Sequence, residues 1–169
     1  MGQINLNKLL IAIKNGDKSA FTKLYENTKR GVFAFIYSYL KNYADAEDAM
    51  QTVYVKIKSG INGYKEGTNA RAWILQIAKN HAINVLNKNN REIPLDESRE
   101  ESASPFEETS VTETMRKVLS EDEQRLIILH VLWGYKHKEI GLMLNCPTGT
   151  VTSKYKRAVE KLRSALKEV

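Results

Sequence analysis

The sequence has a single cysteine, Cys146, so it can form neither an internal disulfide nor a cysteine-rich zinc site. This scarcity fits a reducing cytoplasm. The sequence also lacks a run of about 18 apolar residues, and its start, MGQINLNKLL, lacks the cationic and apolar stretches of a signal peptide. We therefore expect a soluble cytoplasmic protein that does not insert into a membrane.

Residue patterns that carry catalysis are also missing. His81, His130 and His137 are scattered, with no carboxylate or thiol at the spacing of metal ligands. The phosphate-binding GxxxxGKS pattern does not occur, and no nucleophile is paired with a base. These absences predict a protein that is not an enzyme, with no catalytic residue, no metal and no cofactor.

Charge divides the chain into three blocks. Residues 1–91 hold 14 basic and 6 acidic residues, residues 92–110 hold 1 and 7, and residues 111–169 hold 11 and 7. The blocks therefore carry net charges of +8, −6 and +4 within the total of +6. Two basic blocks favour two surfaces that meet polyanions, although ordinary solvated charge gives the same balance.

Helical periodicity dominates residues 1–91. Gly16 is expected to end a first helix and Asp17 to cap the next. Asp45 and Asp48 resemble a capping arrangement at the start of a helix over about 45–59. The outward face of that helix is predicted to hold polar residues and one apolar residue. They are Asp48, Gln51, Thr52 and Val55.

A loop and a long helix follow. The segment 60–68 carries three glycines and breaks the helical pattern. The next helix, over about 69–90, is apolar on most of its circumference and is therefore expected to pack against neighbours on two sides. A polar strip runs between those sides. It contains Gln76, Lys79, Asn80, Asn87 and Asn90.

Residues 92–110 combine seven acidic residues, four serines and two prolines with few large apolar groups. This composition predicts a disordered linker. Fully extended, it reaches about 60 Å at ~3.3 Å per residue. That length exceeds one turn of duplex, about 34 Å, so the flanking halves could occupy separate DNA elements at once.

Residues 111–169 show a helix-turn-helix pattern. A capping box of Ser120 and Glu123 opens one helix, which ends at Gly134. A short helix over about 136–144 turns Ile140 and Leu144 inward, and Gly141 suits a close helix approach. After the turn at 145–147, where Cys146 is expected to be buried, a last helix over about 148–167 would enter the major groove by its N-terminal end.

Polar residues near the start of that last helix are candidates for DNA contact, because hydroxyls and cations suit base edges and phosphates. The candidates are Thr148, Gly149, Thr152, Ser153, Lys154, Lys156 and Arg157. The alternative is a plain helical hairpin that packs on a partner protein.

Three segments together resemble the extracytoplasmic-function sigma factors of the sigma-70 family. They are DAEDAMQTVYVKIKS at 45–59, RAWILQIAKN at 71–80 and the C-terminal run from LSEDEQRL to VEKLR. The resemblance spans nearly the whole chain and implies an all-α fold with two small helical domains. Region 2 would occupy 1–91, an acidic linker 92–110, and region 4 with its helix-turn-helix 111–169.

The resemblance implies that the helix over 45–59 docks on the clamp of the polymerase beta-prime subunit. The implied contacts are Asp45, Glu47, Asp48, Gln51, Thr52 and Val55. Where the family usually reads Glu-Thr-Phe after Gln51, this chain reads Thr52-Val53-Tyr54.

The glycine loop and the following helix would open and read the minus-ten element of the promoter. A base taken from the stack needs an aromatic platform and polar edges, which Tyr64, Lys65 and Asn69 could supply. The implied set is completed by Arg71, Gln76, Lys79, Asn80 and Asn87. The alternative is that these are ordinary solvated polar residues.

Region 4 would read the minus-thirty-five element and touch the beta-subunit flap. The acidic linker resembles the segment that threads the polymerase's RNA path, and a simple tether is the alternative. Many members of the family are held inactive by an anti-sigma factor. A monomer that directs transcription initiation by core RNA polymerase at promoter DNA is thus the leading hypothesis. A stand-alone helix-turn-helix regulator and a protein-binding helical adaptor are the alternatives.

Overall fold

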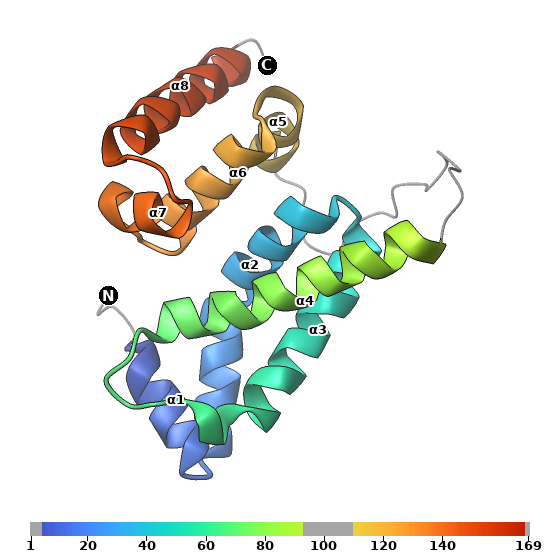
Figure 1. The fold of residues 1–169 in the computed structure, drawn as a ribbon, viewed down its shortest axis with the longest axis vertical. Coiled ribbons are helices and arrows are strands. Elements are labelled where there is room, and N and C mark those ends of the chain that lie inside the picture. The colour runs from blue at the N-terminus through green and yellow to red at the C-terminus, as the bar shows by residue number, and fades with distance from the viewer. Residues whose placement is uncertain (1–4, 93–109, 168–169) are drawn as a thin grey trace. The chain divides into compact units, whose positions relative to one another are not determined.

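The computed structural model describes residues 5–92 and 110–167, and these residues are helical with short turns and contain no strand. The chain divides into two compact units, Met1–Glu101 and Ser102–Val169 (Figure 1). The expected all-α fold with two helical units is confirmed. The interior of the acidic linker, 93–109, lies outside the described residues, and the predicted domain bounds at 91/92 and 110/111 stay a prediction.

Within residues 5–92, the N-terminal unit has four α-helices and one 3-10 turn. In chain order they are α1 (Leu6–Lys14), α2 (Lys18–Leu40), α3 (Tyr43–Ser59), η1 (Ile61–Gly63) and α4 (Ala70–Glu92). Gly16 separates α1 from α2 with a φ of 91°, which favours glycine. The Asp17 carboxylate accepts from the backbone N–H groups of Ser19 and Ala20 at 2.8 and 3.2 Å, so it caps α2 as predicted.

Helix α3 begins earlier than the sequence indicated. Asn42 is its N-cap, and the side-chain oxygen of Asn42 accepts from the backbone N–H of Asp45 at 2.9 Å. The expected capping role of Asp45 is therefore wrong. Asp45 instead lies in the first turn of α3, where its negative charge interacts favourably with the positive end of the helix dipole.

The core of this unit forms where α2, α3 and α4 pack together, with α1 against α2. Its fully buried side chains include Leu10, Leu24, Ile36, Val53, Ile57 and Ile74. One polar pair lies among them, because the Tyr54 hydroxyl and Thr28 Oγ1 are 2.7 Å apart. Burial raises the pKa of Tyr54, so its hydroxyl stays protonated and holds α3 to α2.

The C-terminal unit consists of α5 (Ser110–Val118), α6 (Glu121–Ile127), a π-helical turn η2 (Ile128–Leu132), α7 (His137–Met143) and α8 (Thr148–Lys167). The capping box of Ser120 and Glu123 is present at the start of α6. Gly134 ends this helical segment with a φ of 67°. Helix α5 was not predicted; it packs on α8 through Met115 and Val118, beside buried Leu119.

The turn between α7 and α8 depends on Gly141 and Asn145. A Cβ on Gly141 would lie 2.7 Å from the backbone oxygen of Cys146, so the predicted close approach is present. Asn145 has a φ of 52° and turns the chain toward α8. Two expectations are wrong here: Leu144 is 39% exposed rather than turned inward, and Cys146 is only half-buried.

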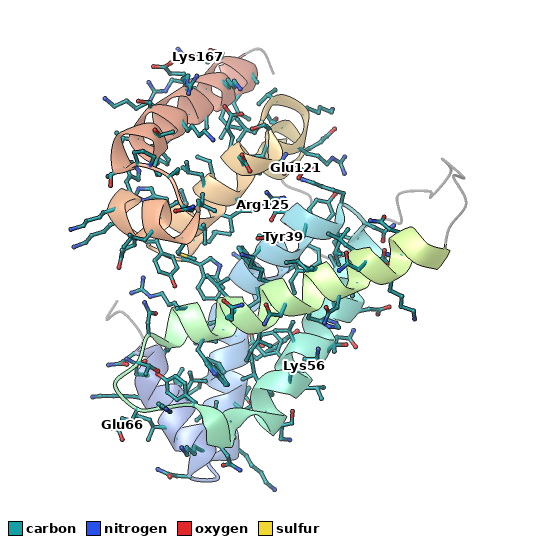
Figure 2. All side chains as sticks on the ribbon, viewed as in Figure 1. Tyr39, Lys56, Glu66, Glu121, Arg125 and Lys167 are labelled. Carbon is teal, nitrogen blue, oxygen red and sulfur yellow. The ribbon has the colours of Figure 1, made fainter. Side chains whose placement is uncertain are left out.

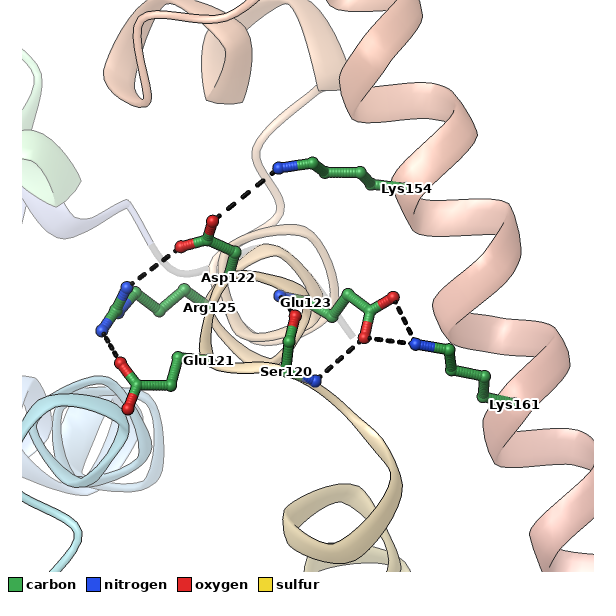
Figure 3. Close-up of polar contacts among 7 residues, drawn as sticks. All are labelled: Ser120, Glu121, Asp122, Glu123, Arg125, Lys154 and Lys161. Atoms are coloured by element: carbon green, nitrogen blue, oxygen red, sulfur yellow. Dashed lines mark hydrogen bonds and ion pairs between the residues drawn. The ribbon is translucent and has the colours of Figure 1, made fainter.

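Helix α6 is tied to α8 by Glu123 and Lys161. Lys161 Nζ donates to both carboxylate oxygens of Glu123 at 2.8 and 2.9 Å, while Glu123 also accepts from the Ser120 backbone N–H at 2.9 Å (Figure 3). Burial opposes ionisation of Glu123, but the bonds from Lys161 and Ser120 outweigh it and lower its pKa. One carboxylate thus caps α6 and holds α8.

This pair predicts a pH dependence. A carboxyl whose pKa is lowered by folding stabilises the folded state above its unfolded value, about 4.3, and that stability is lost as pH falls through the folded pKa. Glu123→Gln keeps a capping side chain but loses the ion pair, so we expect it to cost about 1 kcal/mol at pH 7 and less at pH 3. Urea unfolding in a Trp73→Phe background, where Trp133 is the only tryptophan, measures both values by fluorescence, and an equal cost at both pH values would contradict the assignment.

Candidate functional site

The outward face of α3 carries a narrow stripe in which Asp48, Gln51 and Val55 follow one another at helical spacing. All three are exposed, and Val55 is 66% exposed although it is apolar. Thr52 beside them is half-buried, and its hydroxyl donates to the Asp48 carbonyl at 3.1 Å. A single exposed apolar side chain is common on protein surfaces, so the stripe is a candidate protein contact only through the combination of Val55 with Asp48 and Gln51.

The other two residues predicted for this surface lie at its margin. Asp45 and Glu47 are both half-buried. Asp45 accepts from the side-chain amide of Asn89 on α4 at 3.1 Å, so its carboxylate already joins two helices. Further along the same flank of α3, Lys56 (labelled in Figure 2) lies 3.1 Å by its Nζ from His81 Nδ1. The stripe is therefore bounded on one side by contacts with α4.

Tyr64 does not offer a stacking face. Its side chain is only 1% exposed, and its ring lies 5.2 Å from that of Trp73. The hydroxyl donates to Asn7 Oδ1 at 2.5 Å, and the same oxygen accepts from the Ala70 backbone N–H at 3.2 Å. The expectation of an aromatic platform at Tyr64 is wrong, because this ring anchors the glycine loop between α1 and α4.

Asn7 is a residue that sequence reasoning missed. Its role depends on a contact 57 residues along the chain, which no local pattern reveals. Lys14 supports the same loop, because its Nζ donates to the Tyr64 carbonyl at 3.1 Å. Helix α1 therefore holds the loop through two side chains.

A polar strip lies along α4 as predicted from its periodicity. Gln76, Lys79, Asn80 and Asn87 are exposed, and Gln76 donates to the Asn80 side-chain oxygen at 2.8 Å. Lys65 and Asn69 are exposed before the helix, where Asn69 accepts from the Ala72 backbone N–H at 3.1 Å. Arg71 is half-buried. The strip continues over three helical turns with donors and acceptors facing outward.

The residues of α8 that were predicted to contact DNA fall into two groups, because some face outward and others contact neighbouring helices. Gly149, Ser153, Lys156 and Arg157 are exposed on the outward face, with Thr148 exposed at the helix start. Thr152 lies on the flank that meets α7, within 3.1 Å of His137 Nδ1. Lys154 lies on the flank that meets α6, 3.7 Å from Asp122. The outward face thus keeps one small residue, one hydroxyl and two cations.

An aromatic cluster of His130, His137 and Tyr155 supports the α7 flank. The ring centroids lie 4.7 to 5.0 Å apart. The Thr152 hydroxyl donates to the Thr148 carbonyl at 3.0 Å, so His137 Nδ1 is the donor toward Thr152. Burial, together with the nearby His130, lowers the pKa of His137. Two of the three histidines that looked scattered in the sequence, His130 and His137, therefore lie together beside Tyr155 of α8.

Within residues 5–92 and 110–167, the side chains form no group of three or more residues suited to holding a metal ion. In the same ranges, no helix has the length and apolar character needed to cross a membrane.

Two families match this chain. Residues 24–92 match Sigma-70 region 2, and residues 113–162 match Sigma-70, region 4. The matches cover most of α2 and all of α3 and α4 in one unit, and most of α5 to α8 in the other. The chain therefore belongs to the sigma-70 family, as a sigma factor of the extracytoplasmic-function group that directs promoter-specific transcription initiation.

Similar proteins cover nearly the full length of the chain. The RNA polymerase sigma-H factor of Pseudomonas aeruginosa is 25% identical over 94% of this chain and 92% of its own. The RNA polymerase sigma factor CarQ of Myxococcus xanthus is 26% identical over 92% and 94%. The ECF RNA polymerase sigma-E factor of Escherichia coli K12 is 26% identical over 95% and 93%.

Two solved structures share the fold. The sigma factor RpoE of Bartonella quintana, determined with the anti-sigma factor NepR, has a TM-score of 0.63 and 22% identity, over 87% of this chain and 96% of that one. CnrH, determined with the cytosolic domain of CnrY, has a TM-score of 0.61 and 18% identity, over 96% and 97%.

Proposed function

We propose that the stripe on α3 holds core polymerase, that the α4 strip reads the minus-ten element, and that the outward face of α8 reads the minus-thirty-five element. The observation that carries the proposal is that both matched regions present an exposed face of the required chemistry. The α3 stripe of Asp48, Gln51 and Val55 suits the clamp of the beta-prime subunit, with Asp45, Glu47 and Thr52 at its margin.

Strand separation would proceed without catalysis by this chain, because captured bases offset the cost of unpairing. Tyr64 is buried and is the only aromatic residue in 60–69. Base capture in this chain therefore relies on polar side chains rather than on stacking in the loop. The proposed set is Lys65, Asn69, Arg71, Gln76, Lys79, Asn80 and Asn87.

On α8, base edges and phosphates would be met by Gly149, Ser153, Lys156 and Arg157, with Thr148 at the helix start. Arginine makes bidentate contacts with guanine, and lysine neutralises phosphate. Thr152 would act from the flank with a hydroxyl whose hydrogen is already donated to Thr148. These contacts assign sequence readout to the first three turns of α8.

The polymerase beta flap would meet the apolar side chains of η2 and α7. Val131, Leu132 and Leu142 are 60%, 52% and 79% exposed, and exposed apolar side chains of this number mark a protein contact. An anti-sigma factor would cover surfaces of both units, and the support is that the sigma factor RpoE, which shares this fold, was determined with the anti-sigma factor NepR. The chain would act in the cytoplasm, as a non-enzymatic monomer when free of partners.

The test is in vitro transcription with purified core polymerase and a pool of promoter fragments, followed by sequencing of transcript starts. We expect new starts that share two spaced upstream elements. Gln51→Ala should reduce binding to core polymerase. Arg157→Ala should reduce transcription only from promoters that depend on the minus-thirty-five element. Thr22→Ala, an exposed α2 residue outside these surfaces, is the matched control. Sequence-specific DNA binding without new starts would instead support a stand-alone helix-turn-helix regulator.

A further inference from the structure

Lys154 lies in the first half of α8 and forms an ion pair with a carboxylate of α6 instead of facing outward. Its Nζ lies 3.7 Å from Asp122 Oδ2, whereas Lys156 and Arg157 are exposed on the outward face. Lys154 therefore sits within the segment proposed to enter the major groove, but its charge is directed toward α6 (Figure 3).

Asp122 is held in place by a second cation. Arg125 donates to Asp122 Oδ1 at 3.2 Å and to Glu121 Oε2 at 2.8 Å. The guanidinium is largely shielded, with 18% of the Arg125 side chain exposed, and both Glu121 and Arg125 are labelled in Figure 2. The resulting chain of alternating charges runs from Glu121 through Arg125 and Asp122 to Lys154.

The pair between Asp122 and Lys154 is not needed to hold α6 on α8. Its side chains are 65% and 37% exposed, and ion pairs this exposed to water contribute little to stability. Glu123, whose side chain is 11% exposed, already joins the two helices through its two bonds from Lys161. The contact between Asp122 and Lys154 is therefore open to a role other than folding.

We propose that Asp122 is a specificity-determining residue that withholds Lys154 from DNA phosphates and so weakens binding to DNA of any sequence. The inference rests on the proposed DNA contact of α8. Phosphate contacts supply affinity without sequence information, and each one makes binding more dependent on salt. A carboxylate that occupies one such cation reduces non-specific affinity while leaving Ser153, Lys156 and Arg157 free to contact DNA.

The test compares Asp122→Asn with Glu121→Gln in the full chain. Both changes remove one negative charge from the first turn of α6, but only Asp122 contacts Lys154. The probe is a fluorescent duplex of random sequence, titrated between 50 and 200 mM salt. We expect D122N to bind several-fold more tightly at 50 mM and to steepen the slope of log K against log salt by about 0.9, one phosphate contact. The gain in affinity of D122N over the unaltered chain should be about 3.5-fold smaller at 200 mM than at 50 mM salt.

The control E121Q should leave the slope unchanged, because it frees no cation on α8. The double variant D122N/K154M should return the slope to that of the unaltered chain. Circular dichroism and tryptophan fluorescence, to which both Trp73 and Trp133 contribute, check that each variant is folded. If D122N and E121Q have the same affinity and the same salt slope, or if the steeper slope persists in D122N/K154M, the proposed role of Asp122 is wrong. If the unaltered chain binds no duplex at all and gives no promoter starts as holoenzyme, the proposed function itself fails.

Discussion

Replacing Gly141 by valine is expected to prevent folding of the C-terminal unit while the N-terminal unit stays folded. A Cβ at Gly141 would lie 2.7 Å from the backbone oxygen of Cys146 and 3.6 Å from the backbone nitrogen of Thr148. Because these are main-chain atoms of the turn, the clash is relieved only by moving α8 away from α7. Overpacking typically costs about 1–3 kcal/mol and occasionally more. A clash with main-chain atoms belongs at the upper end of that range, which is a large share of the stability of a small unit.

Trp133 gives a direct measurement, because it is buried in the C-terminal unit. In a Trp73→Phe background it is the only tryptophan in the chain, so its fluorescence reports urea unfolding of that unit alone. Gly149→Ala is the matched control: a Cβ there meets nothing within 4 Å, and alanine gains up to about 1 kcal/mol in helix propensity. A Gly141→Val chain with native Trp133 emission and an unchanged urea midpoint would contradict the packing described here.

Features that depend on local spacing could be predicted from the sequence. Asp17 and the box of Ser120 and Glu123 cap helices where the sequence placed them, because a cap bonds only to residues two or three positions away. The close approach at Gly141 and the bounds of α8 were also predicted from residue types and their spacing within a short segment. Asn42 was missed because Asp45 is an equally good capping residue by type, and only backbone geometry distinguishes the two.

Features that depend on distant partners could not be predicted. Periodicity shows which side chains share a face, but not which neighbour covers that face. Tyr64 lies in a glycine loop with no period, and it is buried because Asn7 and Trp73 meet it from other helices. Leu144 has the spacing of a core residue, yet it is the C-cap of α7 and is exposed.

The same limit applies to the candidate contacts on α8. Thr152 and Lys154 have the residue types of DNA contacts and lie among them in the sequence. Each is instead engaged by a helix on its own flank, Thr152 by His137 and Lys154 by Asp122. Their angular positions around the helix axis could have distinguished them from the outward residues. Thr152 and Lys154 both lie closer in angle to the buried face of Val151 and Ala158 than Ser153 does.

Val55→Glu is expected to weaken binding to core polymerase by roughly thirtyfold, which corresponds to about 2 kcal/mol at the contact. Val55 is the apolar member of the α3 stripe, and a contact that covers it must also cover any charge that replaces it. Burying an unpaired carboxylate is costly. The isolated chain should not be affected, because the site is 66% exposed and glutamate has a better helix propensity than valine.

Fluorescence anisotropy of the labelled chain titrated with core polymerase measures this effect. Thr22→Glu introduces the same charge at an exposed position of α2 and should bind core like the unaltered chain, while Val55→Leu should retain binding because it keeps the apolar surface. Binding of Val55→Glu to random-sequence duplex should stay within about twofold, since the α3 stripe is proposed to meet protein and each charge alters phosphate attraction only modestly. Equal core affinities for Val55→Glu and Thr22→Glu would move the polymerase contact away from the α3 stripe and leave the polar strip of α4 as the alternative docking surface.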